Sequence, residues 1–216
     1  MRLVSELRRE SVVNVHTLNH DLLFEALAKT ESVWGRVSDG FDEYGSEYFG
    51  KLRIGNNSYY CCLDRYVGKY DTGLRLFKLH GSIDYVPFSR KADDNIFRLE
   101  NYVKIKSGIS PTEILRNNEK KDGYELSPFE CHADFLSGHK HKQLRYEEPV
   151  LYKRLLDEFR SNLRKSAKLI IIGYGCKDDG INSIVKESFD YKNKPAFIVD
   201  NRASDCVKDF ANSISA

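Results

Sequence analysis

The 216-residue chain is 41% hydrophobic and 31% charged, which supports one good core, or one core with a small lobe, under a well-solvated surface. Its 34 basic and 32 acidic side chains give a formal net charge of +2, so charge gives no reason to expect nucleic acid or an anionic membrane as the main partner. The sequence has no apolar run near the roughly 20 residues that span a bilayer, and residues 1–10 lack the apolar stretch of a secretory signal.

The N-terminal elements follow from the spacing of apolar residues. Leu3 and Leu7 lie four apart and predict a helix over residues 1–9. A β-branched run predicts a strand over residues 12–18, and apolar residues at helical spacing predict a helix over residues 21–29. Residues 74–79 alternate more, which favours a strand that lies nearer an edge of the sheet or under a partial cover.

The last third of the chain alternates between helix and strand patterns. Helices are expected over residues 149–167, 181–189 and 204–214, and strands over residues 169–172 and 196–199. Both strands are almost continuously apolar, which is typical of strands buried on both faces of a parallel sheet. The order predicts an α/β fold: a Rossmann-like parallel sheet with helices on both faces, plus a small inserted lobe.

Two stretches do not follow this alternation. Residues 34–71 are rich in Gly, Tyr and Asp, and residues 87–147 are polar and aromatic. Long excursions of this kind are usually functional or partly disordered. We therefore expect residues 1–86 and 148–216 to form the Rossmann-like domain, and residues 87–147 to form an inserted small lobe or a long excursion over the sheet.

Polar residues follow four of the expected strands. Ligands of open α/β sheets bind beyond the carboxyl ends of the strands, so this placement predicts a nucleotide site. Each residue also has a structural explanation: Asn19 or Asp21 could cap a helix, His80 could be a core histidine, and the glycines could serve only tight turns. The candidate residues are Thr17, Asn19, Asp21, His80, Gly81, Ser82, Gly173, Tyr174, Gly175, Asp200 and Asn201.

Three motifs in this set resemble one known family. Residues 17–21 (TLNHD) resemble the T-x-N-x-D motif of the sirtuin (SIR2) superfamily, and residues 79–82 (LHGS) resemble its H-G motif. Residues 173–182 (GYGCKDDGIN) resemble the G-Y-x-x-x-D-x-x-I-N segment of SIR2-like domains in bacterial defence proteins. The resemblance runs over about residues 12–214, and the combination of motifs is more specific than any one of them.

The resemblance implies catalytic roles for three residues. Asn19 would orient the nicotinamide ribose or the attacking water, and Asp21 would hold the nicotinamide carboxamide. His80 would be the base that engages the ribose hydroxyls. These residue types suit the chemistry, because cleavage of the glycosidic bond of NAD develops oxocarbenium character that an oriented nucleophile and a base can exploit.

The resemblance also implies NAD as the substrate. Gly173 and Gly175 would let backbone N–H groups approach the nucleotide, and the following helix would favour its phosphates. Asp200 would accept hydrogen bonds from the adenosine ribose. The remaining residues assigned to NAD binding are Thr17, Gly81, Ser82, Tyr174 and Asn201.

The cysteine pattern separates this chain from the protein deacylases of the superfamily, which carry a zinc ribbon after the H-G motif. The five cysteines are odd in number and irregularly spaced, and no C-x-x-C pair is present, so neither a disulfide framework nor a zinc ribbon is expected. A reducing cytoplasm is the favoured compartment. Near Cys131 stand His132, His139 and His141, but their Gly- and Lys-rich surroundings favour a solvated loop over a metal site.

A second difference concerns the N-terminus. The family carries a first strand and a G-A-G-x-S loop before T-x-N-x-D, and nothing upstream of Val12 matches them. The first βα unit of the expected fold therefore has no counterpart. Either the chain is a piece of a longer protein, or it is a degenerate relative. A missing central strand would leave an exposed strand edge.

The leading interpretation is a zinc-free NAD hydrolase that yields ADP-ribose and nicotinamide and depletes NAD in antiviral defence. The alternative is a catalytically silent module that binds NAD or ADP-ribose, or that assembles into a larger complex. Protein deacylation is a weaker option, because it requires a bound zinc. The resemblance further predicts a homo-oligomer, or a partner subunit or domain that is an ATPase or a sensor.

Overall fold

The computed structural model describes residues 2–30, 35–92, 94–118, 123–128, 132–137, 142–201 and 204–215. The chain divides into two compact units, residues 1–155 and residues 156–216. The boundary falls within helix α4 (Tyr152–Lys165). Among the described residues, no helix is long and apolar enough to cross a membrane.

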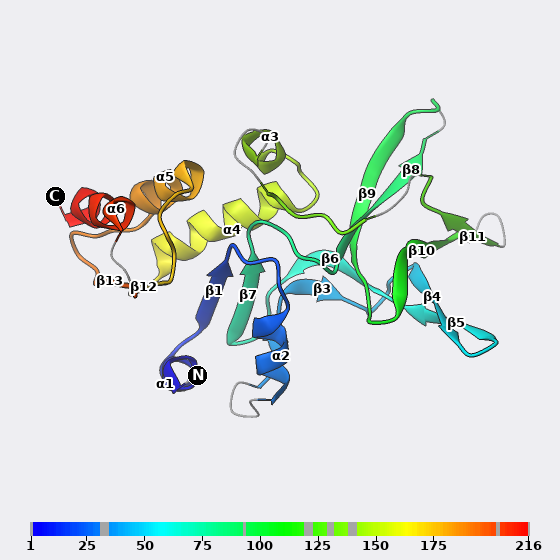
Figure 1. Ribbon diagram of the computed structural model, residues 1–216, viewed down its shortest axis with the longest axis horizontal. Helices are drawn as coiled ribbons and strands as arrows, with labels where there is room; N and C mark the ends of the chain where they lie inside the picture. Colours follow the sequence, from blue (N-terminus) through cyan, green and yellow to red (C-terminus); the bar gives the residue numbers. More distant parts are fainter. Residues whose placement is uncertain are drawn as a thin grey trace. The chain divides into compact units, whose positions relative to one another are not determined.

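The first unit contains a parallel sheet whose strands run in the order β1-β7-β2 (Figure 1). Strands β1 and β7 and the two helices before and after β1 match expected segments, whereas β2 was not predicted. Because β1 and β7 are parallel and in register, their carboxyl ends meet at one edge. These elements are α1 (Arg2–Glu10), β1 (Val13–Thr17), α2 (Leu23–Thr30), β2 (Val37–Ser38) and β7 (Leu74–Lys78).

The position of β7 differs from the expectation. We predicted a strand nearer an edge or under a partial cover, but β7 is central, with β1 on one side and β2 on the other. Its side chains Leu74, Leu76 and Phe77 are fully buried. The prediction from the alternating pattern was wrong because Lys78 is also buried. A charged residue in this run therefore does not mark an exposed face of the strand.

Most strands of the first unit are antiparallel and form two four-stranded sheets (Figure 1). One sheet has the order β3-β6-β9-β8, built from Gly40–Asp42, Asp64–Lys69, Phe97–Lys104 and Tyr85–Lys91. The other has the order β11-β10-β4-β5, built from Gly123–Leu126, Ile109–Asn118, Tyr48–Ile54 and Asn57–Cys62. An α/β fold with parallel strands is thus confirmed. A Rossmann-like architecture is not, because the sheets are largely antiparallel.

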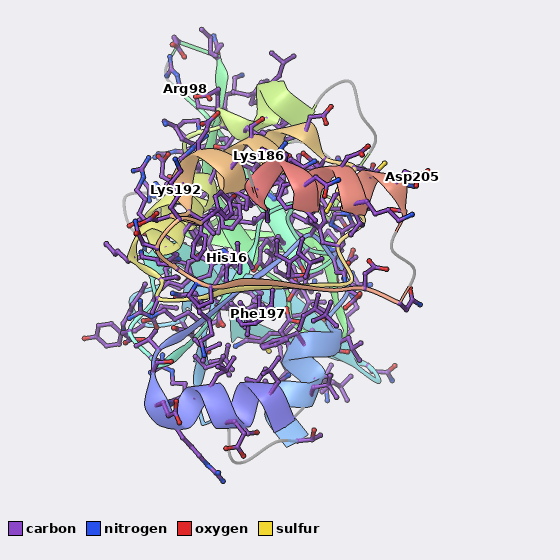
Figure 2. The ribbon with its side chains drawn as sticks, turned by 90° about the vertical axis from the view of Figure 1, so that its left-hand side faces the viewer. His16, Arg98, Lys186, Lys192, Phe197 and Asp205 are labelled. Atoms are coloured by element: carbon purple, nitrogen blue, oxygen red, sulfur yellow. The ribbon has the colours of Figure 1, made fainter. Side chains whose placement is uncertain are left out.

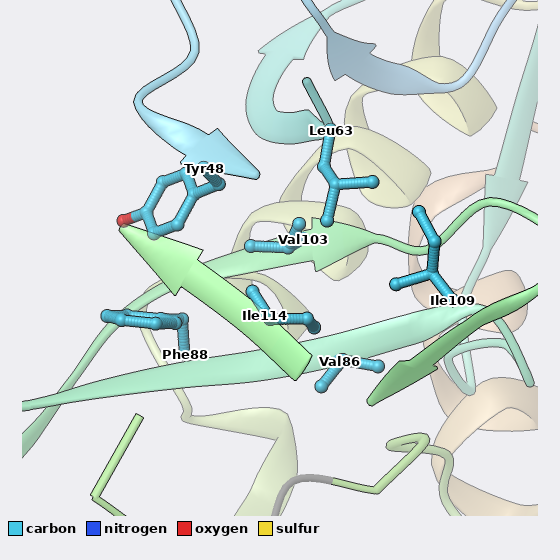
Figure 3. Close-up of a cluster of buried hydrophobic side chains, with 7 residues drawn as sticks. All are labelled: Tyr48, Leu63, Val86, Phe88, Val103, Ile109 and Ile114. Carbon is cyan, nitrogen blue, oxygen red and sulfur yellow. The ribbon is translucent and has the colours of Figure 1, made fainter. Parts of the chain in front are cut away.

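A compact apolar cluster forms a core of the antiparallel region (Figure 3). It takes side chains from strands of both antiparallel sheets, so these strands pack together through their apolar faces. Gly50 permits the close approach, because a Cβ there would lie 2.7 Å from the Ile109 side chain. The cluster consists of Tyr48, Leu63, Val86, Phe88, Val103, Ile109 and Ile114.

The antiparallel strands occupy both stretches that the alternating pattern left unexplained. β3 to β6 lie within residues 34–71, and β8 to β11 lie within residues 85–126. The two antiparallel sheets are therefore formed by segments that precede β7 and segments that follow it in the chain, while β7 itself belongs to the parallel sheet.

The second unit contains a two-stranded parallel sheet and two helices at the positions expected. β12 (Leu169–Ile172) pairs with β13 (Ala196–Val199), and α5 (Asp179–Ser188) and α6 (Asp205–Ser215) follow the two strands. On α5, Lys186 lies over the ring of Phe210 of α6, 5.5 Å from its centroid.

Burial of these two strands is lower than expected. Continuous apolar sequence predicted cover on both faces, but Ile172 is 61% exposed, and Phe197, labelled in Figure 2, is 52% exposed. Each strand pairs only with the other within the described part of the unit. Each therefore lacks a second neighbouring strand whose side chains would pack beside its own.

Candidate functional site

The loops after β1 and β7 lie side by side at the carboxyl edge of the parallel sheet. The Leu79 amide donates to the Thr17 carbonyl at 3.0 Å, and the Ile83 amide donates to the His20 carbonyl at 3.1 Å. The structure therefore brings residues 17–21 together with residues 79–83, as the parallel arrangement predicted.

The first loop, residues 17–21, is shaped by its own side chains. Thr17 Oγ1 accepts a hydrogen bond from the Asn19 amide at 3.0 Å, and Asp21 Oδ1 accepts one from the Leu23 amide at 2.9 Å. Asp21 thus satisfies an amide at the start of α2, as a capping residue does. Asn19 and Asp21 are both exposed, so a ligand can reach them from solvent.

His80 is buried in a group of rings. Its side chain is only 4% exposed, and its Nε2 lies 3.1 Å from the hydroxyl of Tyr146, at the end of the short helix α3 (Lys142–Tyr146). The ring of His20 stacks near it at a centroid distance of 6.2 Å, and His20 in turn contacts Phe135 at 4.7 Å. The Nε2 atom of His80 therefore has a hydrogen-bonding partner within the protein.

Lys78 makes three polar contacts, which the sequence did not predict. Its ammonium donates to the Asp21 carbonyl and to Ser82 Oγ at 2.8 Å, and it pairs with Glu25 Oε1 at 2.9 Å. The Lys78 side chain is 1% exposed and the Glu25 side chain is 15% exposed. Ser82 also donates to the His20 carbonyl at 3.3 Å. This one lysine therefore joins both loops to helix α2.

Gly81 is required by chain packing. Its φ of +79° lies in the left-handed region, and a Cβ there would lie 2.4 Å from the Asp134 carbonyl oxygen and 2.7 Å from the Tyr152 hydroxyl. Gly81 also forms an isolated antiparallel bridge with Phe135. A role of Gly81 in nucleotide binding stays a prediction, and the close packing gives this glycine a structural reason of its own.

The other candidate residues lie in the second unit. Register pairs Ile172 with Val199, so the glycine and the aspartate that follow these strands, Gly173 and Asp200, stand at the same end of the two-stranded sheet. The Gly173 amide donates to the Val199 carbonyl at 2.9 Å, and its φ of +62° explains why glycine suits the turn. Gly175 is half-buried and Asn201 is exposed.

The G-Y-x-x-x-D-x-x-I-N residues form one local structure. Tyr174 Oη donates to Asn182 Oδ1 at 2.9 Å, and Asn182 Nδ2 donates to the Cys176 carbonyl at 2.8 Å. Asp178 caps α5 by accepting from the Ile181 amide at 3.1 Å. The motif is thus explained in part by its own turn and cap. Its ligand-binding role stays a prediction.

Metal binding gains no support from the described residues, which contain no group of three or more His, Cys, Asp or Glu side chains that could hold an ion. Cys131, His139 and His141 lie outside the described residues, and His132 is exposed.

His16 precedes the first loop and has a strongly shifted pKa. Its ring stacks on Phe77 at a centroid distance of 4.5 Å, and Phe77 stacks in turn on Tyr70 at 4.1 Å. Burial lowers the pKa of the His16 imidazole from 6.5 to about 3. The folded protein therefore keeps this side chain neutral at pH values where an exposed histidine is charged.

Replacing His16 with phenylalanine is expected to weaken the acid sensitivity of the fold. Between pH 6.5 and about 3 the unfolded chain binds a proton at His16 that the folded protein excludes. Stability is therefore complete above this window and falls as the pH drops through it, by up to about 1.4 kcal/mol per pH unit from this group. Urea denaturation at several pH values measures the slope, and equal slopes in wild type and His16→Phe would contradict the assignment.

Comparison of the chain with protein-family models finds no match, and comparison with curated proteins finds none either. Membership of the SIR2 superfamily therefore stays a prediction that rests on the motif residues. The two loops of the first unit and their contacts are the basis on which a function is proposed.

Proposed function

We propose that the chain hydrolyses NAD to ADP-ribose and nicotinamide, and that it acts in antiviral defence by depleting NAD. One observation carries the proposal: the loop with Asn19 and Asp21 lies against the loop with His80 at the carboxyl edge of a parallel sheet. This is the place where open α/β sheets bind ligands. The proposal also takes up the resemblance of residues 17–21 and 79–82 to the SIR2 motifs.

The proposed reaction is attack of water on C1′ of the nicotinamide ribose. The glycosidic C–N bond breaks, nicotinamide leaves with the bonding electron pair, and the ribose carbon gains oxocarbenium character. Asn19 orients the water or the ribose, and Asp21 holds the carboxamide. His80 accepts the proton, either from the water or through a ribose hydroxyl. Holding these groups in place supplies the rate enhancement.

The test is release of nicotinamide and ADP-ribose from NAD, measured by liquid chromatography. Asn19→Ala is the first variant, because Asn19 is exposed and its loss leaves the core intact. Loss of one orienting hydrogen bond is expected to lower kcat on the order of 100-fold. Asn117→Ala is the matched control, since Asn117 is an exposed asparagine on β10 of the same unit. The absence of product with the wild type would contradict the proposal. Equal values of kcat in wild type and Asn19→Ala would show that Asn19 has no catalytic role.

A second candidate function is nucleotide binding without turnover. It is favoured by the engagement of two proposed catalytic groups in structural contacts: Asp21 accepts from the start of α2, and His80 is buried against Tyr146. Calorimetry with ADP-ribose separates the candidates, because heat of binding without product release from NAD supports the silent module.

A further inference from the structure

Tyr146 stands in direct contact with the proposed base. Its hydroxyl lies 3.1 Å from His80 Nε2, and the two rings are tilted by only 23° at a centroid distance of 6.3 Å. The two residues are 66 positions apart in sequence. This contact is therefore a product of the tertiary fold, and some other part of the structure must hold Tyr146 in place.

Arg145, the residue before Tyr146, anchors this end of the helix. Its guanidinium pairs with the carboxylate of Asp134, which is 8% exposed, and donates to the Tyr102 hydroxyl at 3.1 Å. Tyr102 also donates to Asp134 Oδ2 at 2.6 Å, and the guanidinium lies 5.2 Å from the centroid of the Tyr152 ring. A charge paired with a buried carboxylate and covered by a ring is a strong anchor for the end of α3.

Asp134 is fixed in turn to the backbone around His80. Its amide donates to the Tyr85 carbonyl at 2.8 Å, and the Leu136 amide donates to the His80 carbonyl at 2.7 Å. The same short segment therefore touches the His80 main chain and, through its aspartate, the anchor of Tyr146. Main chain and side chain of His80 are held by one connected set of contacts.

We propose that Tyr146 is a positioning residue for His80, held in place by the Arg145–Asp134 pair. A neutral imidazole carries its proton on one nitrogen only, so the partner at one nitrogen affects both. A hydroxyl can donate or accept, so the Tyr146 hydroxyl at Nε2 fixes the orientation of the ring, and the nitrogen shifts report the tautomer. The inference rests on the proposed function in taking His80 as the base.

The test reads the ring nitrogens of His80 directly. Long-range proton–nitrogen NMR of histidine-labelled protein, at one pH above the titration range of histidine, gives the 15N shifts of Nδ1 and Nε2. Tyr146→Phe keeps the ring and removes only the hydroxyl, and it is expected to move both nitrogen shifts of His80. Tyr44→Phe is the matched control, because Tyr44 is 91% exposed, and it is expected to leave His80 unchanged.

Two further variants test the anchor. Arg145→Gln removes the charge opposite Asp134, and Arg145→Lys keeps the charge but loses the guanidinium plane that contacts Asp134 and lies over the Tyr152 ring. Both are expected to move the His80 shifts in the direction seen with Tyr146→Phe. Arg145→Lys provides the readout if Arg145→Gln fails to fold. In the NAD assay, Tyr146→Phe is expected to lower kcat about tenfold with little change in KM.

The outcomes separate this inference from the proposed function. Unchanged His80 nitrogen shifts in Tyr146→Phe would overturn the positioning role, whatever the activity. Changed shifts in Tyr146→Phe but not in folded Arg145 variants would overturn the role of the anchor. Changed shifts in a protein that releases no nicotinamide would leave the positioning of His80 established and would overturn the proposed hydrolysis.

Discussion

Replacing Lys78 with methionine is expected to lower the free energy of unfolding of the first unit by about 3–5 kcal/mol. The loss leaves the Glu25 carboxylate, which is 15% exposed, without its cation. It also removes the donor to the Asp21 carbonyl and to Ser82. A buried acceptor or charge left unpaired costs more than the pair itself contributes, which is why the expected effect is large. Urea denaturation followed by circular dichroism measures it.

Lys69→Met is the matched control for this change. Lys69 forms an ion pair with Asp42 at 2.9 Å, but its side chain is 48% exposed, so its loss is expected to cost far less stability than the loss of Lys78. The double variant Lys78→Met/Glu25→Gln removes both charges and is expected to regain part of the stability that Lys78→Met loses. A cost for Lys78→Met similar to that of Lys69→Met would show that the buried pair does not hold the two loops.

The elements that the sequence predicted correctly have strong local patterns. Helix α4 is an example, because Leu155, Phe159 and Leu163 repeat every four residues and all three are buried. The parallel strands β1, β7, β12 and β13 are short segments rich in aliphatic residues, and they begin and end close to the expected residues. Periodicity records which residues share a face, and it therefore identifies single elements well.

The antiparallel sheets were missed because their strands are mixed in polarity. All six residues of β5 are exposed or half-buried, so the strand has no apolar face to reveal it. A signal was nevertheless present: Gly55-Asn56 joins β4 to β5 as a two-residue hairpin loop, with Gly55 at a φ of +58°. Gly-Asn between two strand-like runs is a recognised hairpin pattern.

The candidate site was only partly accessible from sequence for a different reason. The strand-end position of Asn19, Asp21 and His80 follows from local pattern and parallel pairing. Their partners Lys78 and Tyr146 do not, since no periodicity tells which charged side chain turns inward or which distant tyrosine meets a histidine. A lysine directly between the apolar residues Phe77 and Leu79 was the available hint.

Replacing Gly81 with alanine is expected to destabilise the first unit by about 2–5 kcal/mol, for two separate reasons. A φ of +79° costs an alanine on the order of 1–2 kcal/mol. The added methyl group also overlaps the Asp134 carbonyl, a backbone atom that cannot swing aside, and overpacking of this kind costs about 1–3 kcal/mol. Urea denaturation measures the sum.

Gly55→Ala separates the two causes. Gly55 has a similar positive φ of +58°, but a Cβ there meets nothing within 4 Å, so this variant carries the backbone strain without the overlap. The difference between the two variants is then the cost of pushing residues 134–136 away from the H-G turn. A cost for Gly81→Ala equal to that of Gly55→Ala would mean that the segment moves freely. In that case the glycine after His80 would be needed only for its backbone conformation. A larger cost would make close packing against residues 134–136 a second reason for glycine in the H-G motif of this chain.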